Sequence, residues 1–229
     1  MKKSSILILI IICLVGCKKG SNETTITGEI KGLGTDTLYL YGMDELYDRI
    51  DTIYVENDKF SYTTSVDTIT SAYLLLKNRI EYPVFLDKGN KIKIKGDTIN
   101  LNFLTISGNI YNEEFTDFQK ALEDPADPSE KAGEETVDKR TTVEKANTAE
   151  EMAEEFILQH HSSYVSLYLL DKYFVQKETP DFSKIKKLVE VMTGVLQDKP
   201  YIERLNETIT QAEKSEIGKY APFFSLPNA

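Results

Sequence analysis

The chain has 229 residues and a formal net charge of −10 at pH 7, with 41% hydrophobic and 28% charged residues. That hydrophobic share is enough for a folded core, and the length allows one or two domains. The acidic balance argues against nucleic acid or anionic lipid as a partner, because both bind through clustered lysine and arginine. We therefore expect no nucleic-acid partner.

The first residues of the chain have the pattern of a secretory signal. Two lysines give a positive start, residues 6–15 form an unbroken apolar run, and the small residue Gly16 precedes a cysteine. A run of about ten apolar residues is shorter than the roughly twenty that span a bilayer. The order predicts a signal peptide over residues 1–16 that is removed on export.

The segment Leu14-Val15-Gly16-Cys17 resembles the lipobox of bacterial lipoproteins. In that family the chain is cut after the position of Gly16, the cysteine thiol is diacylated, and the new amino terminus is acylated. The resemblance implies lipidation of Cys17 with fatty acids such as palmitate, followed by a lipidated tether over residues 17–24. Several acyl chains hold a protein on a membrane, whereas one chain binds only marginally. We expect a lipid-anchored protein of the bacterial cell envelope, on the outer membrane facing the periplasm.

Cysteine and histidine usage limits the chemistry of the mature chain. Cys13 lies in the apolar run and Cys17 is the expected lipid acceptor, so no thiolate is left for disulfide exchange. His160 and His161 are adjacent, and neighbours on a helix point about 100° apart, so they do not clasp one metal ion. We expect a helix-end pair of partly exposed histidines, no metal and no cofactor.

From residue 25 to residue 107 the dominant sequence period is two. Apolar residues alternate with polar ones in several short runs, among them Ile26/Ile30, Phe60/Tyr62 and Ile92/Ile94. The runs at 38–41, 72–76 and 84–86 are more continuously apolar, as central strands tend to be. Pro83 should sit at a strand start or on an edge strand. Short strands at this spacing predict an antiparallel β-sandwich or barrel.

After residue 107 the period changes to that of helices, so we expect an α+β protein whose helical region covers residues 108–214. A first apolar stripe is formed by Tyr111, Phe115, Phe118 and Leu122. Residues 124–145 lose nearly all large apolar side chains and predict a charged linker or a projecting, solvated helix. The doublet Glu113-Glu114 is expected on a solvated helix face.

The remaining helices have recognisable start signals. A capping-box pattern at Thr148–Glu151 predicts the beginning of one helix. A second is expected over residues 164–175, a third near Pro180 and a fourth from Pro200. The third should carry one apolar stripe, formed by Phe182, Ile185, Val189, Met192 and Leu196.

The last residues, 215–229, contain the spacing G-x-x-A-P-x-F from Gly218 to Phe224. This spacing resembles the leading segment of the thioredoxin-like domain in peroxiredoxin-type and membrane-tethered thiol-disulfide oxidoreductases. With the lipobox and the β-rich start at Ile26–Ile30, the chain resembles a bacterial lipoprotein family in which a domain of unknown function precedes a thioredoxin-like domain. In that family a W-C-x-x-C motif follows some tens of residues later. It does not occur in this chain, so the resemblance assigns no catalytic residue here and implies a truncated thioredoxin-like part.

These observations predict a non-enzymatic, membrane-anchored accessory domain that spaces a redox domain from the membrane and presents partner proteins to it. One alternative is an independent envelope lipoprotein whose sandwich captures a peptide or a glycan. The chain has 13 tyrosines, and several fall in the sheet region: Tyr39, Tyr41, Tyr47, Tyr54 and Tyr62. Such rows either bind ligands or pack a small sandwich. A further alternative is the relic of a broken gene.

Overall fold

The computed structural model describes residues 22–43, 46–76, 80–123 and 142–215. The strands are β1 (Glu23–Lys31), β2 (Asp36–Gly42), β3 (Ile50–Val55), β4 (Lys59–Ser65), β5 (Thr70–Leu76), β6 (Ile80–Leu86), β7 (Lys91–Asp97) and β8 (Thr105–Ser107). The helices are α1 (Ile110–Glu123), α2 (Thr142–Gln159), α3 (Tyr164–Leu170), the π-helical turn η3 (Asp171–Val175), α4 (Phe182–Val191), the 3₁₀ turn η4 (Gly194–Leu196) and α5 (Pro200–Ser215).

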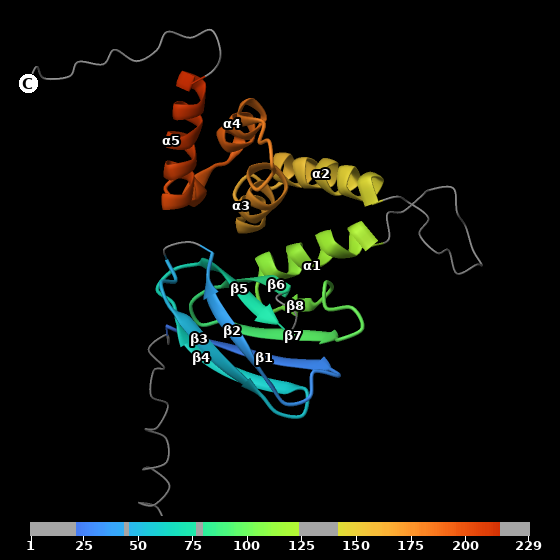
Figure 1. The fold of residues 1–229 in the computed structure, drawn as a ribbon. Helices are drawn as coiled ribbons and strands as arrows, with labels where there is room; N and C mark the ends of the chain where they lie inside the picture. The colour runs from blue at the N-terminus through green and yellow to red at the C-terminus, as the bar shows by residue number, and fades with distance from the viewer. Residues whose placement is uncertain (1–21, 44–45, 77–79, 124–141, 216–229) are drawn as a thin grey trace, which may run out of the picture.

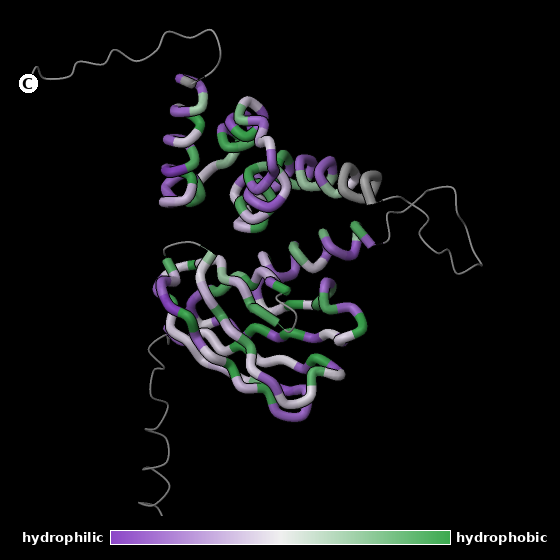
Figure 2. Tube along the Cα trace, viewed as in Figure 1, coloured by the Kyte–Doolittle hydropathy of each residue, from purple (hydrophilic) through white to green (hydrophobic). Residues whose placement is uncertain are grey.

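The strands form two four-stranded sheets that pack face to face, in the orders β4-β1-β7-β8 and β3-β2-β5-β6 (Figure 1). Every strand pair is antiparallel except β1 with β7. Hydrophobic and hydrophilic residues alternate along the strands (Figure 2), and Ile26, Leu40 and Ile92 are fully buried between the sheets. The structure confirms the predicted α+β fold with an N-terminal antiparallel sandwich.

The most apolar strands do not all lie in the middle of a sheet. β2 and β5 are central, as predicted, but β6 is an edge strand although Val84, Phe85 and Leu86 are fully buried. The prediction of a central strand was wrong there because helix α1, which follows β8, covers that edge. Pro83 lies in this edge strand, as its missing amide donor requires.

Two helix predictions need correction. Helix α2 begins at Thr142, so the capping-box pattern at Thr148–Glu151 lies inside the helix, and the last residues of the predicted linker belong to it. Helix α4 ends at Val191, and Met192 is already extended. The stripe from Phe182 to Leu196 therefore spans two elements. Gly194, whose φ of +64° favours glycine, starts the separate turn η4. Helix α3 continues through η3, and α5 begins at Pro200, as predicted.

Aromatic rings join the sandwich to the helical region. The ring of Phe115 in α1 lies 5.7 Å from Tyr82 in β6 and 5.1 Å from Tyr168 in α3, both edge-on. Tyr168 in turn lies 6.4 Å from Tyr73 in β5, and Tyr111 lies 5.2 Å from Tyr164. Edge-to-face pairs add stability beyond the area that they bury. The sandwich and helices are thus packed together through α1 and α3.

Helix α5 starts close to the sandwich and runs away from it (Figure 1). The ammonium of Lys199, just before the helix, lies 3.5 Å from the Ile69 carbonyl oxygen and 4.8 Å from the centre of the Tyr164 ring. At 1.5 Å per residue, 16 residues of α-helix are about 24 Å long. The helix therefore carries the chain well beyond the sandwich surface at Ser215.

Candidate functional site

The residues predicted to carry the lipid and the cleavage site, Cys17 and Gly16, lie outside the described residues, as do the signal peptide and all of the last segment after Ser215. None of the helices in the described ranges has the length and apolar character needed to cross a bilayer. The same ranges contain no group of three histidine, cysteine, aspartate or glutamate side chains able to hold a metal ion.

Helix α1 closes the sandwich at one pair of sheet edges. Asn112, 1% exposed, accepts a hydrogen bond from the Phe85 amide (3.0 Å) and donates one to the Phe85 carbonyl (2.8 Å) in β6. One turn later Thr116 makes the same pair of bonds, both 3.0 Å, with the amide and carbonyl of Ile106 in β8. Two polar side chains of one helix thus replace the missing neighbour strand of both sheets. Their role is structural.

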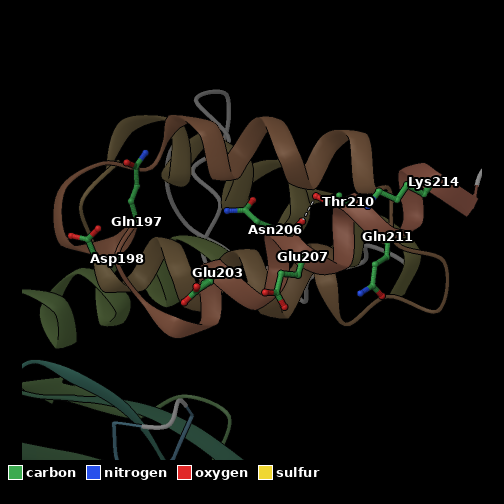
Figure 3. Close-up of a pocket in the computed structure, with 8 residues that line it drawn as sticks. All are labelled: Gln197, Asp198, Glu203, Asn206, Glu207, Thr210, Gln211 and Lys214. Carbon is green, nitrogen blue, oxygen red and sulfur yellow. Dashed lines mark hydrogen bonds between the residues drawn. The ribbon is translucent and has the colours of Figure 1, made fainter.

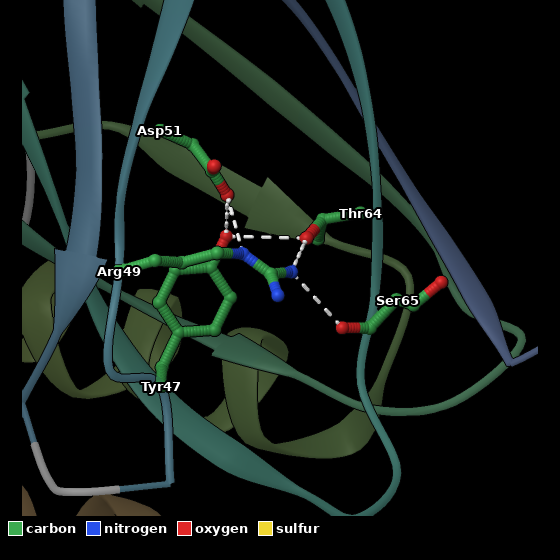
Figure 4. A network of polar contacts seen from close by, with 5 residues as sticks. All are labelled: Tyr47, Arg49, Asp51, Thr64 and Ser65. Atoms are coloured by element: carbon green, nitrogen blue, oxygen red, sulfur yellow. Dashed lines mark hydrogen bonds and ion pairs between the residues drawn. The ribbon is translucent and has the colours of Figure 1, made fainter.

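A polar network fills the opposite seam, between β3 and β4 (Figure 4). The buried Tyr47 hydroxyl donates to Asp51 and lies 3.2 Å from the Thr64 hydroxyl. The guanidinium of Arg49 lies over the Tyr47 ring, donates to Asp51 (3.1 Å) and Thr64, and reaches the Ser65 carbonyl (3.1 Å). The network links two strands that share only a single bridge near their turn, at Glu56 and Lys59.

Ionisation within this network follows from its contacts. Burial, and then the hydrogen bond to Asp51, raise the pKa of Tyr47 to about 12. Burial alone would raise the pKa of Asp51, but hydrogen bonds from Tyr47, Arg49 and Tyr62 outweigh it, so the pKa lies below its usual value. The tyrosine stays neutral and the aspartate charged at neutral pH. This arrangement holds a seam together, and both Tyr47 and Tyr62 serve packing and hydrogen bonding.

A polar groove of about 940 Å³ runs along α5 (Figure 3). Its lining side chains are Gln197, Asp198, Glu203, Asn206, Glu207, Thr210, Gln211 and Lys214. All eight are exposed. Because no buried group points into it, we interpret this groove as the solvated face of α5.

A smaller pocket of about 410 Å³ lies where α1, the end of α2 and the segment after α4 meet. Its lining residues are Ile110, Tyr111, Glu114, Gln159, His160, His161, Ser162, Ser163 and Thr193. Here the Ser163 hydroxyl donates to the Glu114 carboxylate at 2.5 Å, and the His160 Nδ1 lies 3.6 Å from the other oxygen of that carboxylate. Ligand sites typically combine a concavity of this size with a few convergent polar groups. This pocket is the candidate site.

The cluster in this pocket is unsuited to nucleophilic catalysis of the serine–histidine–acid type. That chemistry needs the histidine between the serine and the carboxylate, where it takes the hydroxyl proton. Here Glu114 lies between Ser163 and His160. Ser163 also accepts a hydrogen bond from the Val165 amide as the N-cap of α3. The cluster can bind a ligand through hydrogen bonds, but it does not present an activated nucleophile.

The histidine pair and the Glu113–Glu114 doublet are the sequence-predicted candidates that lie at or near this pocket. His160 and His161 follow directly after α2, one half-buried and one exposed, which confirms the prediction of a helix-end pair. The prediction that Glu114 is on a solvated face was wrong: its side chain is 21% exposed and faces Ser163 and His160, whereas Glu113 is exposed. No local sequence pattern indicates this contact, because Glu114 and Ser163 are 49 residues apart in the chain.

The tyrosines of the sheet region divide between packing and exposure. On the outer face of the β3-β2-β5-β6 sheet, Tyr41 donates to Glu81 and its ring lies 5.7 Å from Tyr73, which packs on Tyr168. Tyr39 and Tyr54 lie on the same face and remain 42% and 74% exposed. The helices therefore cover the β5 part of this face and leave the β2–β3 part open.

The fold and the pocket define a β-sandwich protein with a helical region packed against it and a polar pocket between α1 and the end of α2. Residues 24–115 match the family described as "Domain of unknown function (DUF4369)". The match runs from β1 into α1, so it includes Asn112, which covers the edge of β6. Comparisons with curated proteins and with solved structures gave no match.

Proposed function

We propose that the chain is a lipid-anchored protein of the bacterial cell envelope. The observation that carries this proposal is the order of a positive start, an apolar run and Leu14-Val15-Gly16-Cys17. In this proposal Cys17 bears the acyl chains, and the body that begins at β1 faces the periplasm, next to the outer membrane. The acidic character of the chain is compatible with such anchoring, since attraction to anionic lipid is not needed once several chains insert.

The role proposed for the folded body is that of a non-catalytic spacer for a thioredoxin-like domain. Two features support it. The aromatic contacts through Phe115 and Tyr168 pack the sandwich against the helices, so the two parts keep a fixed relative orientation instead of moving about a linker. Helix α5 leads away from the sandwich (Figure 1). It is followed in the sequence by residues 217–226, which resemble the leading segment of a thioredoxin-like domain. An insulin-reduction assay on this chain should give no turnover above background.

The anchoring proposal is tested by the two cysteines of the chain. Labelled palmitate should be incorporated into the wild-type protein and the Cys13→Ser variant expressed in a bacterial host, but not into Cys17→Ser. Mass spectrometry of the amino-terminal peptide should show an acylated Cys17 as its first residue. Equal labelling of the wild type and Cys17→Ser, or an unmodified Cys17, would refute the anchor.

A second candidate function is ligand capture at the cell envelope. The exposed aromatic face of β2 and β3 and the polar pocket at the α1–α2 junction both favour it, since exposed apolar patches mark interaction sites and ligand pockets combine a concavity with a few convergent polar groups. In this case the ligand is a peptide or a glycan.

A further inference from the structure

The pocket formed by α1, the end of α2 and Thr193 is lined by groups that hydrogen-bond to a neutral, polar molecule. Glu114 supplies a carboxylate acceptor, while Gln159 supplies an amide and Ser162 a hydroxyl. The two imidazoles of His160 and His161 each act as donor or acceptor. Among the residues lining this pocket there is no lysine or arginine, so an anion would meet the Glu114 carboxylate without a fixed cation to pair with.

Two lining residues add apolar surface to the same pocket. Ile110, at the start of α1, is 61% exposed, and Tyr111, whose ring packs on Tyr164 with centroids 5.2 Å apart, is half-buried. Burial, and then the charges of Glu114 and Asp87, raise the pKa of Tyr111, so the phenol remains a neutral donor. A lining that combines exposed apolar surface with several polar side chains suits a ligand with one face of C–H groups and a rim of hydroxyls.

The polar wall is held in place before any ligand arrives. The carbonyl of His160 accepts hydrogen bonds from the Ser163 amide (3.0 Å) and the Ser166 hydroxyl (2.7 Å). The carbonyl of His161 accepts one from the Thr193 amide (3.0 Å), which ties the loop to the segment after α4. The His160 ring stacks on Phe156 with centroids 4.1 Å apart. A fixed site lowers the ordering cost of binding.

From this geometry we infer that the pocket binds a neutral saccharide of one or two sugar rings. In this proposal the exposed Ile110 side chain contacts the C–H face of a ring, and Glu114, Gln159 and His161 receive its hydroxyls. The pocket volume of about 410 Å³ lies within the range of small-molecule sites. This inference rests on the second function proposed above and is independent of the lipid anchor.

An extended peptide fits this pocket less well. Peptides are commonly captured by adding a strand to an exposed sheet edge. On the two edge strands that α1 covers, the backbone groups of Phe85 in β6 and Ile106 in β8 are already bonded to Asn112 and Thr116. The described residues of the pocket present side chains and a hydrogen-bonded loop, and they lack the row of unpaired backbone groups that an added strand needs. Saccharide binding through side-chain hydrogen bonds therefore fits it better.

The two histidines provide a direct readout of this site, because His160 and His161 are the only histidines in the chain. The full chain is labelled with ¹³C-histidine, purified in detergent and titrated with cellobiose and, separately, with N,N′-diacetylchitobiose. At least one saccharide should shift both histidine ring signals saturably below about 10 mM, a range that covers weak saccharide sites. Reduced, carboxymethylated lysozyme serves as the extended polypeptide and inorganic phosphate as the anion.

Matched variants locate the site. Glu114→Gln should weaken saccharide binding about tenfold, because one charge-assisted hydrogen bond is lost. The neighbouring Glu113→Gln, which changes an exposed carboxylate outside the pocket, should bind like the wild type. Gln159→Ala removes an exposed pocket side chain without touching the core and should also weaken binding, so the test holds even where Glu114→Gln perturbs folding.

Three outcomes would overturn the inference. The first is that neither saccharide moves the histidine signals. The second is a saturable shift with the polypeptide or with phosphate but not with a saccharide. The third is saccharide binding that leaves the histidine signals still and is lost in Tyr54→Ala, which would keep the capture function and assign it to the exposed sheet face instead.

Discussion

The hydrogen bonds by which α1 closes the sandwich can be tested with a nearly isosteric change, Thr116→Val. The Thr116 hydroxyl accepts from the Ile106 amide and donates to the Ile106 carbonyl, both at 3.0 Å, and the residue is 3% exposed. Valine keeps the shape of the side chain and removes both bonds. Because no water reaches them, both backbone groups of this edge strand lose their partner.

The expected loss of stability follows from the two Ile106 backbone groups that Thr116→Val leaves without a partner. Leaving a buried backbone donor or acceptor unsatisfied costs about 1–3 kcal/mol, and two such groups on one residue relax together, so we expect Thr116→Val to lower the free energy of unfolding by about 2–4 kcal/mol. Urea unfolding followed by circular dichroism should show a lower midpoint with an unchanged slope.

The matched control is Thr116→Ser, which keeps the hydroxyl and loses only a methyl group. It should cost about 1 kcal/mol, the usual effect of removing one buried methyl. If Thr116→Val were within about 0.5 kcal/mol of the wild type, or if the serine variant were the less stable of the two, the hydrogen bonds would not be what secures this edge.

Two further predictions concern backbone and charge. Gly108 has a φ of +116°, and a Cβ there would lie 2.2 Å from the Lys91 carbonyl oxygen, so Gly108→Ala should lower the free energy of unfolding by at least about 3 kcal/mol. Gly34 has a φ of +73° but open space around it, so Gly34→Ala should cost only about 1 kcal/mol. Equal losses of stability for the two variants in thermal unfolding would contradict this reasoning. The lowered pKa of Asp51 means that its carboxylate stabilises the fold above about pH 4 and that this contribution is lost as the pH falls through the folded-state pKa. In the Asp51→Asn variant, the free energy of unfolding should fall less steeply as the pH decreases through this range. The same pH dependence in the wild type and the variant would count against the network.

Local sequence patterns predicted most elements because each depends on residues close in the chain. The alternation around Ile26 and Ile92 reflects one buried sheet face, and Pro200 supplied the start of α5 through its fixed φ. The capping-box pattern at Thr148 did not mark the start of α2, which begins at Thr142. A helix that has already formed continues through such a pattern when no residue stops it.

The lipobox-like start, the alternation of the strands and the apolar stripes of the helices were readable from the sequence alone, because each is encoded by neighbouring residues. The position of β6 at an edge, its coverage by Asn112, and the meeting of Glu114 with Ser163 and His160 were decided only by the tertiary structure. Glu114 and Ser163 are 49 residues apart in the chain. Such contacts depend on which helix packs against which edge, and no local period carries that information.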